Sequence, residues 1–382
     1  MQVHRQPTTD YRLPLSKRAN WNAPLNRLTL ARRSRSDLLD LTETNPTRCG
    51  IGYPLDELSD ALARGARATY DPDPRGLLSA RETLAEHLGC EASDLLITAS
   101  TSEAYAFLFK LLTDPGDAIL TATPSYPLLE HLASMEHVAL QTFALEYHRH
   151  WTFDIERFSN AITERTSAIV IVNPNNPTGS FVTPGEANDV AAFGVPLISD
   201  EVFLDYSLDA RGTTIVRDDL LTFTLGGLSK SAGLPHFKFG WIRVSGPGKA
   251  DALNALEMIA DNFLSVATPV QIVLADLLKI GKTIREKISH RTRENLDALR
   301  SATKSKPSAH VLPVEGGWAA VVRVPRVMSD EELALALLDR GVVVQPGYFF
   351  DFEGEGYLVV SLLTERATFD EGVRRVVDMI PA

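Results

Sequence analysis

The chain has 382 residues, of which 44% are hydrophobic, so it is long enough to bury a large core. Its 38 basic and 49 acidic residues give a formal net charge of −11, which argues against a nucleic-acid-binding surface. Cys49 and Cys90 are too few for a disulfide framework or a metal cluster, and no long apolar run or signal-peptide pattern indicates a membrane, so we expect a cytoplasmic protein without a metal site.

Short apolar runs typical of strands alternate with stretches typical of helices. We predict strands over Leu95–Thr98, Ala118–Thr121, Ala168–Val172, Val195–Ser199 and Leu221–Leu225. Between them we predict helices, among them Glu103–Leu112 and Tyr126–Met135. This alternation indicates an α/β fold in which helices cover both faces of a mostly parallel sheet.

The last third of the chain begins a second pattern. The charge-rich segment Lys282–Lys304 has apolar residues near helical spacing, which predicts a long connecting helix. A new α/β pattern follows it and ends in Tyr357–Leu363. We therefore expect a large domain over residues 49–285 and a smaller α/β domain formed by residues 1–48 and 286–382.

Three polar segments each follow a predicted strand. They are the loop Asn173–Gly179, the carboxylate Asp200 and the amine Lys230. In an open α/β sheet, ligands bind at the carboxyl ends of the strands. A lysine can hold an aldehyde as a Schiff base, a buried carboxylate can keep a pyridine nitrogen protonated, and an amide can hydrogen-bond a phenolic oxygen. Singly, each segment reads more readily as a plain strand end or surface residue, but together they predict a pyridoxal phosphate site.

A predicted helix start lies in Thr98–Glu103. Ser100 and Glu103 have the spacing of a capping box, and an apolar helical stretch follows directly. A helix N-terminus can bind a phosphate through its free backbone N–H groups and its dipole. The alternative is an ordinary capped helix without a ligand.

From about Leu39 to its C-terminus, the chain resembles the fold-type I pyridoxal phosphate-dependent enzymes, and among them the class I/II aminotransferases related to aspartate aminotransferase. The Asn-Pro-x-Asn-Pro-Thr-Gly motif of that family is intact at residues 173–179. The resemblance implies that pyridoxal 5'-phosphate is the cofactor. It assigns Asn176 to the phenolic oxygen, Asp200 to the ring nitrogen and Lys230 to the Schiff base.

The same resemblance implies contacts to the cofactor's phosphate and ring. The phosphate loop would comprise Ser100, Thr101 and Ser102, and Ser229 would lie beside the cofactor. Tyr126 would stack on the pyridine ring, the alternative being plain core packing.

Two further positions bear on the phosphate. Lys238 stands where the family usually has an arginine, so the charge is kept but the planar bidentate geometry is lost. Tyr70 matches a tyrosine that in relatives reaches the phosphate of the neighbouring subunit. The resemblance therefore implies a homodimer with shared active sites.

Several positions depart from the family pattern. Phe203 replaces a tyrosine that bonds the phenolic oxygen, and Val359 replaces the arginine that binds the substrate carboxylate. Buried carboxylates need a compensating cation or several donors. We therefore propose Arg48, helped by Asn45, as a relocated anchor, the alternative being that Arg48 is a surface residue.

The resemblance implies an aminotransferase that moves an amino group between an amino acid and a 2-oxo acid through Lys230. The alternative is other pyridoxal phosphate chemistry on amino acids, as in a β-lyase, racemase, decarboxylase or cyclase. A non-catalytic aminotransferase-like binding protein ranks lower, because Asn176, Asp200 and Lys230 are all present. A dinucleotide dehydrogenase is disfavoured because no G-x-G-x-x-G follows an early strand.

Overall fold

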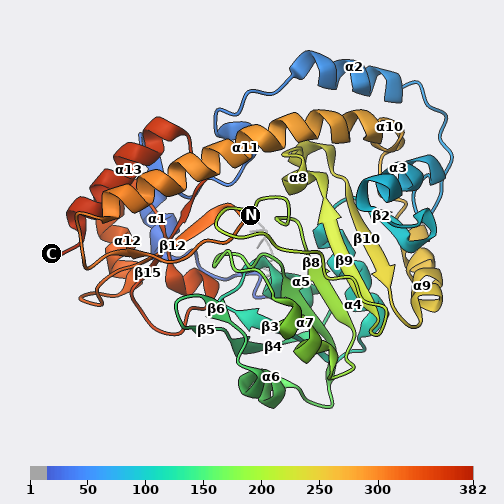
Figure 1. The fold of residues 1–382 in the computed structure, drawn as a ribbon, viewed down its shortest axis with the longest axis horizontal. Helices are drawn as coiled ribbons and strands as arrows, with labels where there is room; N and C mark the ends of the chain where they lie inside the picture. The colour runs from blue at the N-terminus through green and yellow to red at the C-terminus, as the bar shows by residue number, and fades with distance from the viewer. Residues whose placement is uncertain (1–14, 382) are drawn as a thin grey trace, which may run out of the picture.

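The computed structural model describes residues 15–381, which include a seven-stranded and a four-stranded sheet that are covered by helices and connected by a long helix (Figure 1). The larger sheet has the order β2 (Leu95–Thr98), β10 (Gly240–Ser245), β9 (Thr222–Gly227), β8 (Leu197–Asp200), β7 (Thr166–Val172), β3 (Ala118–Thr123) and β4 (Ala139–Ala144). β10 runs antiparallel to both of its neighbours, and the other adjacent pairs are parallel. The prediction of a mostly parallel sheet is confirmed.

Helices cover both faces of this sheet because its strands carry apolar side chains on both sides. One face packs against α4 (Thr101–Leu112), α5 (Leu128–Met135) and α9 (Lys249–Asp261). The other face packs in part against α6 (Ile155–Ala161) and α7 (Pro184–Ala191). α3 (Leu78–Leu88), α8 (Leu228–Ser231) and α10 (Thr268–Ile272) complete that side near β2, with α2 (Leu55–Gly65) outside them.

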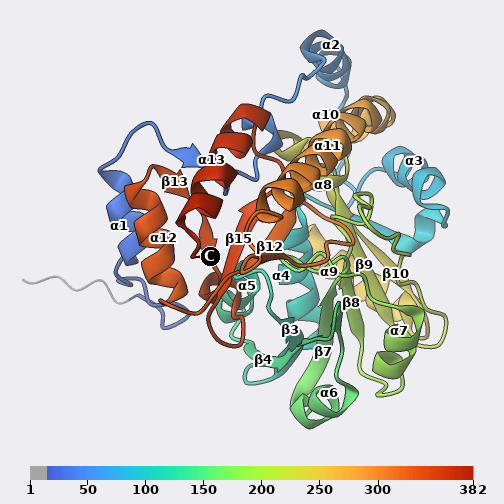
Figure 2. The same cartoon turned by 60° about the vertical axis from the view of Figure 1, so that its left-hand side comes forward.

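The smaller sheet is antiparallel and has the order β11 (His310–Val311), β12 (Ala319–Arg323), β15 (Tyr357–Ser361) and β14 (Gln345–Pro346). It packs with α12 (Asp330–Asp339) and α13 (Arg366–Met379). β1 (Leu39–Asp40) pairs in parallel with β13 (Val342–Val343), and α1 (Arg27–Arg33) contacts α12, so the N-terminal segment joins this part of the molecule (Figure 2).

The long helix α11 (Leu274–Thr303) has 30 residues and links the two sheets. It begins at Leu274 and not at the predicted Lys282, because buried residues such as Leu277 and Ile280 extend its apolar stripe. The predicted domain boundary at residues 285 and 286 falls within α11 and stays a prediction, and residues 1–14 lie outside the described part of the chain. No helix of residues 15–381 has the length and apolar character needed to cross a membrane.

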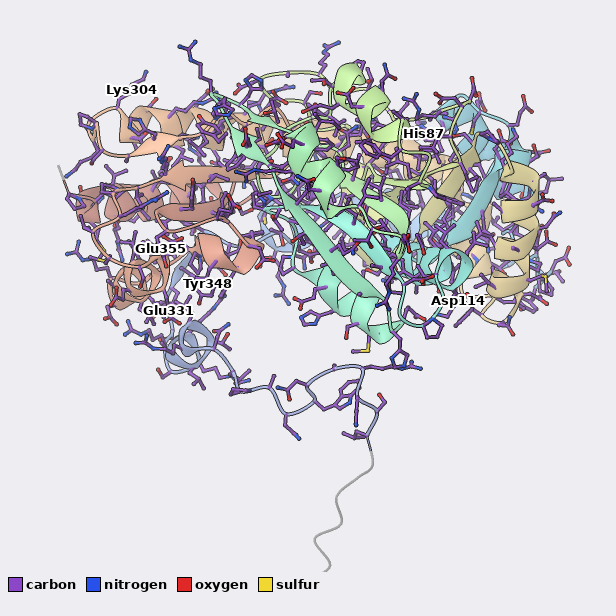
Figure 3. The ribbon with its side chains drawn as sticks, turned by 90° about the horizontal axis from the view of Figure 1, so that it is seen from below. His87, Asp114, Lys304, Glu331, Tyr348 and Glu355 are labelled. Atoms are coloured by element: carbon purple, nitrogen blue, oxygen red, sulfur yellow. The ribbon has the colours of Figure 1, made fainter. Side chains whose placement is uncertain are left out.

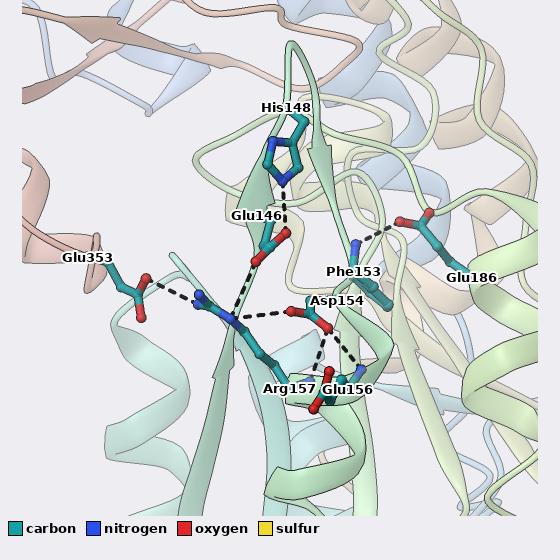
Figure 4. A network of polar contacts seen from close by, with 8 residues as sticks. All are labelled: Glu146, His148, Phe153, Asp154, Glu156, Arg157, Glu186 and Glu353. Carbon is teal, nitrogen blue, oxygen red and sulfur yellow. Dashed lines mark hydrogen bonds and ion pairs between the residues drawn. The ribbon is translucent and has the colours of Figure 1, made fainter.

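Two regions that belong to different sheets meet at Arg157 of α6 (Figure 4). Its guanidinium group lies 3.5 Å from Glu146 of β5 (Glu146–Tyr147), which pairs with β6 (Trp151–Thr152), and 3.4 Å from Asp154. It also contacts Glu353, in the loop before β15, at 3.3 Å. All of these groups are partly or largely exposed, so the contacts contribute little to stability. Figure 3 shows Glu331, Tyr348 and Glu355 lying near one another in the small-sheet region.

Candidate active site

The three predicted site segments meet at the carboxyl ends of β7, β8 and β9. The parallel register places Val172 opposite Asp200 and Asp200 opposite Leu225. The backbone N–H of Asn173 donates to the carbonyl of Asp200 over 2.8 Å. The loop 173–179 and the Asp200 carboxylate are thus held side by side, as expected for adjacent parallel strands.

Asp200 is a buried carboxylate with a donor on each oxygen. Its side chain is 8% exposed, the Tyr105 hydroxyl donates to Oδ2 over 2.9 Å, and the Val202 N–H donates to Oδ1 over 3.2 Å. Burial raises the pKa of Asp200 to about 6, while the two donors and the Lys230 charge oppose that rise. Asp200 and Lys230 are therefore close enough to interact electrostatically.

Lys230 lies in α8, which begins directly after β9. The N–H of Leu228 donates to the Phe239 carbonyl over 2.9 Å, and the Tyr206 hydroxyl donates to the Lys230 carbonyl over 2.6 Å. These contacts fix the short helix. Burial lowers the pKa of the Lys230 amine, and the Asp200 charge partly offsets this. An amine with a lowered pKa is more readily neutral and nucleophilic.

The asparagine-rich loop uses two of its three asparagines to hold its own shape. Asn173 bonds Thr213 and Val182, and Asn175 bonds Pro124 and accepts from Thr178. The amide of Asn176 makes no hydrogen bond to a side chain or backbone group of residues 15–381. Its amide is therefore free to bond a ligand, and its role at the phenolic oxygen stays a prediction.

The predicted phosphate loop forms the start of α4. Ser100 is the N-cap and accepts the N–H of Glu103 over 3.2 Å, as the capping spacing predicted. The return contact differs, because the Glu103 carboxylate accepts the N–H of Ala99 over 2.6 Å, and not that of Ser100. The first N–H groups of a helix have no partner within it, so those of Thr101 and Ser102 can bind an anion.

Backbone packing places β10 directly against this loop. A Cβ atom added to Gly240 would lie 2.9 Å from the Ser100 carbonyl carbon, which only glycine avoids. Lys238, two residues earlier, has a left-handed φ of +50° and an exposed side chain. It directly precedes Phe239, whose carbonyl anchors α8, and Gly240, which packs against the phosphate loop.

The other predicted cofactor contacts differ in exposure. Tyr126 is 47% exposed. Partial burial has the largest effect on its pKa and raises it, and the Asp200 charge raises it further, so Tyr126 lies near that carboxylate. Ser229 is half-buried in α8. Tyr70 is 66% exposed and lines a cavity with Leu264 and Ser265.

The residues predicted to bear on the substrate carboxylate differ in environment. Val359 is 1% exposed and pairs across the sheet with Val321 and Gln345. Arg48 is exposed, in the 3-10 helix η1 (Pro46–Arg48), and the Asn45 side chain caps that helix by accepting from Thr47. Thus Asn45 already uses its side-chain carbonyl oxygen within its own turn.

Two site residues were not predicted from the sequence. Tyr105 lies in the apolar helix α4, where its hydroxyl was the only signal. The ring centroid of Trp318 lies 5.0 Å from the Lys230 Nζ, and the ring centroid of Phe203 lies 5.8 Å from the same atom. Trp318 is 3% exposed, and its indole Nε1 has no partner among the described residues. Buried indole nitrogens usually find a hydrogen-bond partner, so the Trp318 nitrogen beside the Lys230 amine is an exception.

The sequence matches known proteins over most of its length. Residues 39–376 match the family model described as aminotransferase class I and II. The chain is 28% identical over 362 residues to glutamate-pyruvate aminotransferase AlaA of Haemophilus influenzae, which covers 89% of each protein. It is 29% identical over 250 residues to nicotianamine aminotransferase 1 of Oryza sativa, of which it spans 50%.

Solved structures agree with the fold. A tyrosine aminotransferase from Leishmania infantum superposes with a TM-score of 0.86 at 22% identity, over 97% of this chain and 99% of that one. An aminotransferase from Escherichia coli gives a TM-score of 0.85 at 23% identity, over 96% and 98% of the two chains.

Proposed function

The chain belongs to the aminotransferase class I and II family, and we propose how its residues carry out the pyridoxal phosphate-dependent transfer of an amino group between an amino acid and a 2-oxo acid. The observation that carries the proposal is the juxtaposition of the Lys230 amine and the buried Asp200 carboxylate at the ends of adjacent strands.

The donor groups of the site fit pyridoxal 5'-phosphate. Asp200 would face the ring nitrogen, the free amide of Asn176 would meet the phenolic oxygen, and Tyr126 would cover the ring. The phosphate would lie at the start of α4, near Lys238. Close backbone contact between Gly240 and Ser100 gives that end of the site a fixed shape.

When bound, the cofactor supplies an electron sink for charge that develops at the substrate α-carbon. Lys230 would hold the cofactor aldehyde as a Schiff base, and its amine would afterwards move a proton to and from the substrate carbon. The lowered pKa of Lys230 suits both roles, because a neutral amine attacks carbonyl carbon and accepts protons. Asp200 would stabilise positive charge on the ring nitrogen.

One observation favours a second candidate function. Val359 stands in an apolar cluster, at the position where the family resemblance predicts a carboxylate-binding arginine. Elimination, racemisation, decarboxylation or cyclisation of an amino compound would use the same lysine and carboxylate. Product analysis separates these functions: transamination converts the cofactor to its amine form and yields a keto acid without releasing ammonia.

We propose a homodimer with shared sites as the functional form. Large apolar side chains are exposed on α2, after α9 and on α10, on the side that also carries Tyr70: Leu55, Leu62, Phe263, Leu264 and Ile272. Ser265, in the same loop as Leu264, donates to Glu103 of α4 over 2.7 Å. This exposed face therefore adjoins the phosphate loop, where a tyrosine of a second subunit would be needed.

The attachment of the cofactor to Lys230 can be tested directly. We expect borohydride reduction of the cofactor-loaded protein to fix the cofactor on the peptide that contains Lys230, as detected by mass spectrometry. Lys230→Ala should lose both this adduct and nearly all turnover, because Lys230 supplies the amine that interacts with Asp200.

Lys238→Ala is the matched control. It removes a nearby exposed lysine proposed to contact only the phosphate, so it should bind the cofactor more weakly and still form the adduct on Lys230. An adduct on another lysine, or normal turnover in Lys230→Ala, would show that the assignment is wrong.

A further inference from the structure

Tyr105 contacts the carboxylate on which the proposed chemistry depends. It is 5% exposed, and its hydroxyl donates to Asp200 Oδ2 over 2.9 Å from α4, an element 95 residues away in the sequence. The second carboxylate oxygen accepts the Val202 N–H over 3.2 Å. Each oxygen of Asp200 thus has one donor from the protein, which fixes the plane of the carboxylate.

We infer that Tyr105 is a positioning residue that orients the Asp200 carboxylate and favours its ionised form, so that the carboxylate can pair with the ring nitrogen of the bound cofactor. This inference rests on the proposed function. A hydrogen bond from a neutral hydroxyl stabilises a carboxylate more than a carboxylic acid, because the charge strengthens the bond.

The surroundings of Asp200 explain why such a donor is needed. Burial is the largest influence on Asp200 and opposes its ionisation, and Glu201 beside it adds a second buried carboxyl group. Lys230 favours ionisation of Asp200, and Tyr126 and Tyr105 are the other titratable groups that interact with it. Burial raises the pKa of Tyr105 well above its usual value, so Tyr105 stays a donor at neutral pH.

The inference is tested by the affinity of the cofactor-free protein for pyridoxal 5'-phosphate, measured by equilibrium dialysis from pH 5 to 8. Tyr105→Phe removes only the hydroxyl. With Asp200 protonating more readily, we expect the affinity of this variant to fall about tenfold near pH 6. We also expect the midpoint of its decline at acidic pH to move upward by about one pH unit. The cofactor's own phosphate titrates equally for every variant, so it cancels in the comparison.

Tyr206→Phe is a matched control for the loss of a buried tyrosine hydroxyl. Tyr206 is 1% exposed and donates to the Lys230 carbonyl, without a contact to Asp200. Its variant should keep the wild-type pH midpoint, even if the protein becomes less stable. A shift of equal size in Tyr206→Phe and Tyr105→Phe would overturn the inference, since it would reflect general damage to the site.

A double-mutant comparison tests whether the effect of Tyr105 on cofactor affinity depends on the Asp200 carboxylate. In an Asp200→Asn background, we expect Tyr105→Phe to cause little further loss of affinity, because no carboxylate remains to be ionised. The same loss in both backgrounds, or an unmoved midpoint in Tyr105→Phe alone, would overturn the role of Tyr105. Failure of the wild-type protein to bind the cofactor at all would instead contradict the proposed function.

Discussion

At Lys230, burial and aromatic contact act on the amine in opposite directions. The rings of Trp318 and Phe203 lie within cation–π range of the amine and would stabilise its protonated form by about 0.5 to 2 kcal/mol. Burial acts the other way and lowers the pKa of Lys230, and the Asp200 charge partly offsets it. Phe203 supplies a ring but no hydroxyl, so it cannot donate to the cofactor's phenolic oxygen, and Asn176 is the proposed donor to that oxygen.

Arg48 is the residue proposed to bind the substrate carboxylate. Its side chain is exposed and has no ion pair among the described residues, so it is available to bind a carboxylate. If Arg48 anchors the substrate, Arg48→Met should raise KM for amino acids by about tenfold or more, because a charge-assisted contact is lost. Steady-state kinetics with a panel of amino acids would measure this.

Arg340→Met is the control for that experiment, since Arg340 is an exposed arginine after α12. An unchanged KM for every active amino acid in Arg48→Met would exclude the relocated anchor. If simple amines react as well as amino acids with the wild-type protein, the site does not require a carboxylate, in keeping with the apolar surroundings of Val359.

At the scale of elements, Glu201 ties the end of β8 to a distant loop. Its carboxylate accepts the Ile215 N–H over 2.7 Å and the Ser199 hydroxyl over 2.9 Å. Burial raises its pKa from the usual 4.5 to about 7. The folded state therefore favours protonated Glu201. The resulting stability is fully present below pH 4.5 and is lost as the pH rises through about 7.

We therefore predict that Glu201→Gln becomes more stable relative to the wild-type protein as the pH rises. Glutamine keeps the acceptor oxygen and cannot ionise. The difference in the free energy of unfolding should shift in favour of the variant by roughly 3 kcal/mol between pH 4.5 and 8. Urea unfolding of the cofactor-free protein at several pH values measures it, with the exposed Glu164→Gln as control. A difference that does not change with pH would contradict the prediction.

The positions of strands and helices along the chain were easier to predict from the sequence than the order of the strands in the sheet. The apolar runs before Asn173, Asp200 and Lys230 are strands whose ends meet, because local pattern determines where buried strands lie. β10 was not predicted, and it inserts antiparallel between β2 and β9. Strand order depends on contacts between distant segments, which periodicity within one segment cannot reveal.

The same limit applies to the site. Asp200 and Lys230 were identifiable because Asp200 ends a strand, Lys230 comes shortly after one, and both match a motif. Tyr105 and Trp318 reach the site through long-range packing from an apolar helix and from the segment before β12, so no local pattern marks them. The Ser100 cap was predictable from the spacing between Ser100 and Glu103. The hydrogen bond from the Ala99 N–H to the Glu103 carboxylate depends on the backbone path of the preceding turn, which the spacing does not reveal.

At the scale of the whole molecule, the exposed apolar residues around Tyr70 require an explanation. Tyr70, Phe263 and Leu264 are 66%, 52% and 38% exposed on one side of the molecule, beside the loop that reaches α4. Clusters of this kind mark interfaces in soluble proteins. A two-fold symmetric dimer would bury the cluster against its own copy and bring each Tyr70 toward the other subunit's phosphate loop.

We predict that the protein is a dimer by light scattering and that its sites are shared. Tyr70→Phe and Lys230→Ala subunits should each be impaired alone. When they are mixed and reassembled, the hybrid dimer pairs the intact Lys230 of one subunit with the intact Tyr70 of the other. About one quarter of all sites should then recover full function if assembly is random. Activity equal to the mean of the two parents would indicate separate sites, and a stable monomer that binds the cofactor would exclude the shared arrangement.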